Sequence, residues 1–182
     1  SWLSAMSGGN PLLLETLLSD GDVVEHLARG ADAPGGPWTD AYELPSSANL
    51  AGLVRQRLGR LGTATRHTLE AAAVCGSEFP TDLVSELASD AGLAGAVGTG
   101  LLIDEGDVMR FRHGAVQRLV YADLAPGRRL EFHHAVGKAR LARGDPAAIV
   151  APHMLAAVEL DPAAAVTVAR SAADDATNQG AH

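Results

Sequence analysis

One short stretch interrupts the pattern of an otherwise helical sequence. The segment Leu101–His113 reads LLIDEGDVMRFRH and contains two apolar runs separated by a glycine-containing turn. In the second run apolar and charged residues alternate, so that Met109 and Phe111 share one face of a strand and Arg110 lies on the other. Two such runs joined by a short glycine-containing connection are typical of a β-hairpin. We therefore predict a hairpin over about Leu101–Arg112, with Met109 and Phe111 buried.

Helical periodicity dominates the remaining residues. Hydrophobic residues make up 47% of the 182-residue chain and aromatic residues only 4%, a composition that favours helix packed on helix. Proline, glycine and helix-capping residues divide the sequence into segments. Helices are expected over about Pro11–Arg29, from Ser46 or Ser47 to Leu61, Thr63–Gly76, Phe79–Ser89, Ala91–Gly100, and in segments after His113 broken at Pro126-Gly127, Gly144-Asp145-Pro146 and Asp161-Pro162. Thr63 is the expected cap of the helix that it begins.

The order of these segments predicts a mostly α fold. Three helices, a hairpin and a further helix form the layout of a winged-helix module. The helical segments after Pro126 have the spacing of antiparallel pairs in a helical repeat. Cys75 is the single cysteine, which excludes an internal disulfide framework and fits a reducing compartment, while its alanine-rich surroundings favour a small core residue. The chain has neither an apolar run of the roughly 20 residues needed to span a bilayer nor a secretory signal, so we expect a cytoplasmic protein without membrane contact.

Charge is distributed in blocks along the chain. The net charge is −8, and residues 76–109 contain seven acidic residues and no lysine or arginine. A winged helix that reads DNA inserts its third helix into the major groove, and an acidic surface there would be repelled by phosphate. We therefore expect no direct nucleic-acid contact by this module. The alternating blocks favour helices whose charges pair across contacts or face solvent.

A rigid corner near the beginning of the chain precedes a leucine-rich helix. The sequence SGGNPLLLETLL places two glycines before Asn10, which suits an N-cap, and Pro11, which suits the first helical position. This pattern is by itself a common way to begin a helix. Together with later segments it acquires a second interpretation.

Four segments occur in an order that resembles a known family. They are SGGNPLLLETLL, LPSSANLAGLVRQRLGRLGTATRHTLEAAAVCGSEF, GLLIDEGDVMRFRHGAVQRLVYADL and RRLEFHHAVGKARL. Together they resemble the region downstream of the nucleotide-binding core in large ATP-binding regulators of the LuxR type, related to MalT-like signal-transduction ATPases. The resemblance implies a helical lid segment and linker at 1–45, a winged-helix subdomain at 46–125 and the start of a tetratricopeptide-like repeat at 126–182.

The resemblance also implies a nucleotide site. Gly9-Asn10-Pro11 matches the Gly-x-Pro corner that closes over the nucleotide in that family, with the proline against the base. A histidine at the place of His113 senses the phosphates of bound ADP in the related ATPases. An imidazole at a helix N-terminus suits an anion, because backbone N–H groups point the same way. The alternative for His113 is a capping or partly buried residue without a ligand.

The expected function is coupling rather than catalysis. The sequence lacks a G-x-x-x-x-G-K-[ST] loop and an apolar strand ending in a magnesium-binding Asp, so we expect no enzymatic activity of this chain alone. ATP or ADP would bind only with the upstream nucleotide-binding domain of the same protein, and the repeats would receive an inducer or a protein partner. The alternative is a helical scaffold for protein partners with no nucleotide role. His133, His134 and His153 are expected in packing or surface roles and not as a metal site, because adjacent helical residues point about 100° apart.

Overall fold

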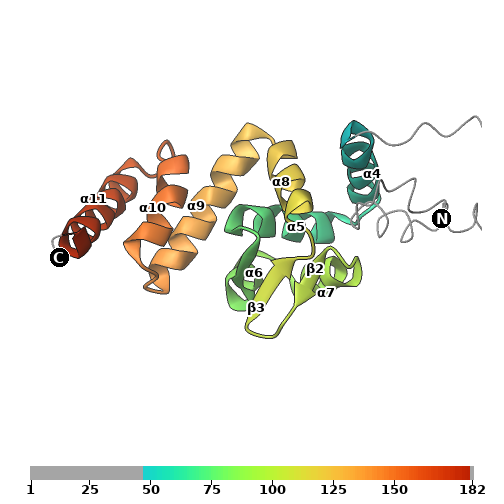
Figure 1. Ribbon diagram of the computed structural model, residues 1–182, viewed down its shortest axis with the longest axis horizontal. Helices are drawn as coiled ribbons and strands as arrows, with labels where there is room; N and C mark the ends of the chain where they lie inside the picture. Colours follow the sequence, from blue (N-terminus) through green and yellow to red (C-terminus); the bar gives the residue numbers. More distant parts are fainter. Residues whose placement is uncertain (1–46, 181–182) are drawn as a thin grey trace, which may run out of the picture. The chain divides into compact units, whose positions relative to one another are not determined.

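A computed structural model of the chain describes residues 47–180. The chain divides between Arg60 and Leu61 into two compact units, which are described separately. In the first unit the described part contains helix α4, Ser47–Gly59, where the sequence predicts a helix. The second unit contains the small sheet and all the later helices (Figure 1). The fold is mostly helical, as predicted.

The second unit begins with a winged-helix arrangement. Helix α5 leads into a strand, two short helices, a hairpin and a further helix, with a three-stranded antiparallel sheet in the order β1-β3-β2. Phe79 of β1 lies opposite Met109, and Leu102 of β2 lies opposite Phe111. The elements are α5 Thr63–Cys75, β1 Glu78–Pro80, α6 Thr81–Leu87, α7 Asp90–Gly98, β2 Leu102–Asp104, β3 Val108–Phe111 and α8 Gly114–Asp123.

The predicted hairpin is confirmed. Strands β2 and β3 pair antiparallel, and the turn closes through a hydrogen bond from the Glu105 N–H to the Val108 carbonyl at 2.9 Å. Gly106 has a φ of 90° in this turn, a conformation that favours glycine. Met109 and Phe111 are buried, whereas Arg110 forms an ion pair with Glu105 at the surface.

The strand β1 corrects one sequence-based prediction. A helix is expected to begin at Phe79-Pro80, but Glu78–Pro80 is extended and the helix α6 begins at Thr81. The aromatic side chain decides this, because Phe79 is only 2% exposed and its ring packs edge-on against that of Phe111. Pro80 ends the strand at a position where its missing N–H is no disadvantage. A smaller correction concerns α5, whose N-cap is Gly62 and not Thr63.

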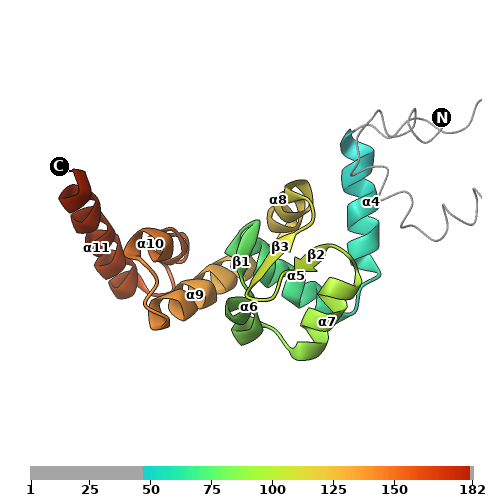
Figure 2. The same cartoon turned by 60° about the horizontal axis from the view of Figure 1, so that its bottom comes forward.

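Helix α5 forms the centre of the second unit. It contacts α6, α7, α8 and α9 (Figure 2). Its C-terminal half is buried throughout, from Thr68 to Cys75 with the exception of the half-buried Glu70. Small residues permit the close approach of α7, because a Cβ added at Gly92 would collide with the Thr68 hydroxyl and the Ala64 carbonyl. The small alanine side chains of α5 therefore allow other helices to pack around it on several sides.

Three consecutive helices complete the described chain. They are α9 Pro126–Ala142, α10 Ala147–Ala156 and α11 Pro162–Gly180, and the breaks between them lie where the sequence predicts them. Helix α10 packs against both α9 and α11 (Figure 1). Val150 and Met154 of α10 form a buried cluster with Ala165 and Val168 of α11.

Candidate functional site

His113 lies between the last strand of the sheet and the next helix. It is the N-cap residue of α8, with extended backbone angles of φ −138° and ψ 121°. Its carbonyl accepts hydrogen bonds from the N–H groups of Val116 and Gln117 at 3.0 and 3.4 Å, while its half-buried side chain does not form the capping hydrogen bond. His113 thus stands immediately before the first turn of a ten-residue helix.

The position of His113 is fixed by the residue before it. The Arg112 N–H donates to the Leu101 carbonyl, and its Nε donates to the Gly100 carbonyl, both at 2.9 Å. Gly100 can accept this contact in a tight turn because it has a φ of 72°. Arg112 therefore ties the end of β3 to the beginning of β2, and α8 starts from a fixed point.

The other predicted nucleotide-binding residues lie outside the described part of the chain. Gly9, Asn10 and Pro11 belong to residues 1–46, so their predicted proximity to His113 stays a prediction. The same holds for the lid segment at 1–45.

Helix α7 occupies the third helical position of the winged-helix module. It buries Gly92 and Ala96 toward the core and contains no lysine or arginine. A Cβ at Gly95 would collide with the side chain of Thr65 in α5, so this face of α7 packs on α5 and is not available to a ligand. The seven acidic residues between Glu78 and Asp107 are all exposed. Such a surface is unsuited to phosphate, and the absence of nucleic-acid contact stays a prediction.

Two groups of charged side chains attach α9 to the winged-helix module. Near its beginning, Arg128 donates from Nε to Glu70 of α5 at 3.3 Å and lies over the Phe132 ring, 4.5 Å from its centroid. At its C-cap, Nη1 of Arg143 lies 2.7 Å from Asp82 and 3.6 Å from Glu86 in α6. The alternating charge blocks of the sequence provide the signal for this pairing, although not the identity of the partners.

A third arginine connects α8 to α9. Arg129 donates from Nη2 to the carbonyls of Tyr121, Ala122 and Leu124, each at 3.3 Å, at the end of α8. A guanidinium at a helix C-terminus satisfies carbonyls that have no partner within the helix. The guanidinium carbon Cζ of Arg129 also lies over the Tyr121 ring, 4.8 Å from its centroid. Helix α8 is in turn held to α5 by Gln117, which donates to the Ala73 carbonyl at 2.7 Å.

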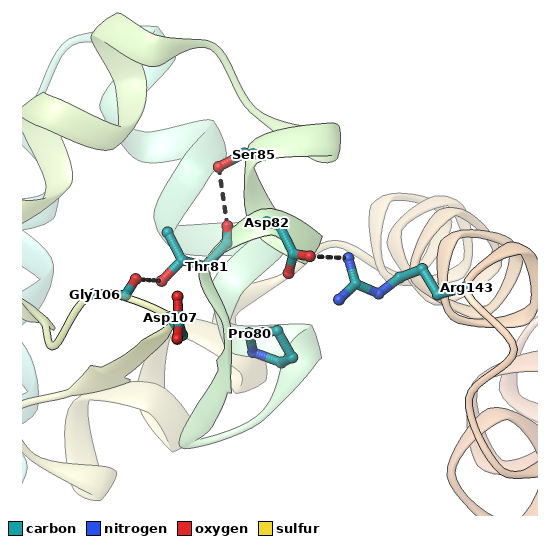
Figure 3. Close-up of a pocket in the computed structure, with 7 residues that line it drawn as sticks. All are labelled: Pro80, Thr81, Asp82, Ser85, Gly106, Asp107 and Arg143. Carbon is teal, nitrogen blue, oxygen red and sulfur yellow. Dashed lines mark hydrogen bonds and ion pairs between the residues drawn. The ribbon is translucent and has the colours of Figure 1, made fainter.

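A polar pocket of about 570 Å³ opens where the module meets the end of α9 (Figure 3). The Thr81 hydroxyl donates to the Gly106 carbonyl at 2.7 Å and joins α6 to the hairpin turn. The hydrogen bond from Arg143 holds the pKa of Asp82 below its usual range. The lining residues are Pro80, Thr81, Asp82, Ser85, Gly106, Asp107 and Arg143. With two carboxylates, one guanidinium and two hydroxyls, the pocket can hold small polar groups.

A chain of hydrogen-bonded rings on α8, α9 and α10 was not predicted from the sequence. The Tyr121 hydroxyl lies 2.9 Å from Nε2 of His133, whose Nδ1 lies 3.1 Å from Nδ1 of His153. No sequence pattern indicates the contact between the two histidines. They are twenty residues apart, and their contact depends on how α10 docks on α9. His134 points elsewhere, with Nε2 3.9 Å from Asp161. Among residues 47–180 no group of three or more acidic, histidine or cysteine side chains is placed to hold a metal ion.

Comparison with models of known protein families, with curated proteins and with solved structures finds no match. Within residues 47–180, no helix combines the length and the apolar content that crossing a membrane requires.

Proposed function

We propose that this chain couples the nucleotide state of an ATPase domain to a helical sensor region in an ATP-dependent transcription regulator of the LuxR type. In this proposal the chain itself is not catalytic, and ATP or ADP binds together with the nucleotide-binding domain that precedes it. The compartment is the cytoplasm, where such a regulator meets its DNA through a separate output domain.

The observation that carries the proposal is the placement of His113. The hairpin ends at Phe111, and His113 follows as the N-cap residue of α8. This is the environment in which an imidazole donates to an anion with support from backbone N–H groups. A nucleotide phosphate held by the ATPase domain is the anion that the sequence resemblance suggests.

A second set of contacts supports the coupling part of the proposal. Helix α9 is attached to α5 through Arg128 and to α6 through Arg143, and its other side packs on α10. A displacement of the winged-helix module would therefore move the first helices of the repeat. No flexible segment is needed to carry the signal within this unit, because only Leu124 and Ala125 separate α8 from α9.

The proposal is tested by two substitutions in the complete regulator. His113→Ala removes one charge-assisted hydrogen bond to the phosphate, worth roughly 1.5–3 kcal/mol, or about ten- to a hundredfold in the resting equilibrium. We expect higher transcription without inducer and weaker ADP binding. Pro11→Ala should mainly weaken nucleotide binding. If His113→Ala leaves both basal transcription and ADP affinity unchanged in a folded protein, His113 is only a helix-end residue.

One observation favours the alternative of a protein-interaction scaffold. Among the side chains whose exposure the structure describes, the large hydrophobic ones that are exposed all lie on or beside the last three helices, between 39% and 56% exposed. They are Leu141, Ile149, Leu155, Val158, Leu160 and Val166. A scaffold would lose partner binding on substitution of Leu155 and Leu160 by Glu and would be indifferent to His113→Ala. A nucleotide-coupled regulator would respond to His113→Ala.

A further inference from the structure

The rings of Tyr121, His133 and His153 connect three helices. Tyr121 belongs to α8, His133 is buried on α9, and His153 is half-buried on α10. The contacts are 2.9 Å between the Tyr121 hydroxyl and His133 Nε2, and 3.1 Å between the two Nδ1 atoms. The chain of rings therefore crosses the interfaces α8–α9 and α9–α10.

The number of protons on these rings decides whether the contacts are hydrogen bonds. A neutral imidazole carries one N–H, so one ring of the histidine pair donates through Nδ1 and the other accepts. When Tyr121 donates to Nε2 of His133, that ring carries its proton on Nδ1 and donates to His153. In the reverse direction His153 donates, and the Tyr121 hydroxyl accepts from His133. The neutral pair is satisfied in both arrangements.

A first additional proton keeps the hydrogen bond but introduces a buried charge. The guanidinium of Arg129 lies near His133, and that of Arg140 lies near His153 and the neutral thiol of Cys75. Burial and the Arg129 charge lower the pKa of His133. Burial, His133 and Arg140 lower the pKa of His153 to about 4. The carboxylate of Asp145 does little to offset a positive charge on the histidine rings, because it already pairs with Arg140 at 2.8 Å.

A second proton removes the hydrogen bond itself. Both Nδ1 atoms then carry hydrogen, and two cationic donors face each other across 3.1 Å. The helices have little room to adjust, because Gly137 of α9 packs directly on Met154 of α10, next to His153. The docked arrangement of α9 and α10 is therefore most stable when both rings are uncharged.

At His134, about 100° around α9 from His133, the electrostatics have the reverse sign. His134 Nε2 lies 3.9 Å from Oδ2 of Asp161, at the beginning of α11. A proton on His134 would face a carboxylate and strengthen this contact. His134 is therefore a suitable control, since it is the neighbouring histidine of the same helix.

We propose that the chain Tyr121–His133–His153 is a protonation-sensitive joint, at which acidification detaches α10 and α11 from α9 while the winged-helix module stays folded. In the detached state His153 leaves this environment and returns to an ordinary pKa near 6.5, so this state binds more protons and is favoured as the pH falls below about 6.5. This inference does not depend on the proposed nucleotide role.

Hydrogen–deuterium exchange of the 182-residue chain tests the joint. Between pH 7.5 and pH 5.0 the opening equilibrium of α10 and α11 should rise roughly ten- to thirtyfold after correction for the intrinsic exchange rate. Peptides from α5 and β3 should keep their protection. Exchange that rises equally in all elements would show global unfolding and would overturn the proposal.

Two substitutions connect this response to the ring pair. In His153→Asn the amide replaces Nδ1 as a hydrogen-bonding group but does not titrate, so the pH response of α10 and α11 should largely disappear. His134→Asn should retain it. A response of the same size in His153→Asn as in the unsubstituted chain contradicts the proposal. Should His153→Asn fail to fold, NMR titration of the histidine rings in the unsubstituted chain decides: His133 and His153 must titrate below 6.5 together with the loss of α10 protection.

Discussion

Arg143 donates a hydrogen bond from Nη1 to Oδ2 of Asp82 at 2.7 Å and so joins the C-terminal end of α9 to the first turn of α6. The two residues are sixty-one positions apart and come from charge blocks of opposite sign. Glu86 adds a second carboxylate, 3.6 Å from the same nitrogen. Both residues line the polar pocket (Figure 3).

The first prediction concerns the pKa of Asp82. The hydrogen bond from Arg143 lowers this pKa, so the contribution of Asp82 to stability is present above its unfolded value of about 3.9 and is lost as the pH falls through the folded value. Arg143→Gln should return the Asp82 pKa toward its ordinary value in an NMR titration. Arg118→Gln, an exposed arginine of α8, is the control and should leave it unchanged. An Asp82 pKa that is insensitive to Arg143→Gln would show that the ion pair does not persist in solution.

The second prediction concerns the hairpin. Phe111 is 4% exposed and packs on Phe79, so Phe111→Ala should lower the free energy of unfolding by about 3–5 kcal/mol in urea denaturation. Its neighbour Arg110 forms an exposed ion pair with Glu105, and Arg110→Ala should cost no more than about 1 kcal/mol. Similar losses for the two variants would be incompatible with the observed alternation of buried and exposed residues in β3.

The third prediction uses two glycines of α9. A Cβ on Gly137 would lie 2.5 Å from Sδ of Met154 and 3.3 Å from Cβ of His153, and Met154 is fully buried. Gly137→Ala should therefore destabilise the packing of α9 on α10 by about 1–3 kcal/mol. Gly127→Ala is the matched control, because a Cβ there meets nothing within 4 Å, and it should stabilise by about 0.4–1 kcal/mol. Thermal unfolding of both variants measures the difference, and equal melting temperatures would argue against the close approach.

The fourth prediction concerns Cys75. Burial raises the pKa of its thiol to about 12, so at pH 8 only about one molecule in ten thousand carries the reactive thiolate. A thiol reagent such as DTNB should leave Cys75 unmodified in the native chain and modify it fully in denaturant. Rapid stoichiometric reaction under native conditions would mean that the centre of the second unit opens readily.

Much of the fold was predictable from local patterns. The alternation in VMRFR identifies β3, and proline and glycine mark the ends of α9, α10 and α11, because these signals act within a few residues. The strand β1 was missed for a physical reason. Three residues before a helix carry no periodicity of their own, and Glu78–Pro80 is extended because Phe79 pairs with Met109, thirty residues later.

The candidate site likewise has parts that local sequence signals predict and parts that depend on contacts between distant residues. The position of His113 at the start of a helix follows from its neighbours in the sequence, and the structure has it there. The contact between His133 and His153, and the pairing of Arg143 with Asp82, depend on how separate helices dock. Charge blocks indicate that such pairs exist, but a one-dimensional pattern cannot select the partners.

Helix α9 belongs to two packing systems at once. Its residues Arg128 and Arg143 hold the winged-helix module, and its residues His133 and Gly137 hold α10. Helix α9 is therefore a packed part of both bodies, the winged-helix module and the pair α10 and α11, and is more than a linker between them. Removing residues 126–142 together with either neighbour would leave the other with an uncovered apolar face, so at neutral pH the two bodies are expected to move as a pair.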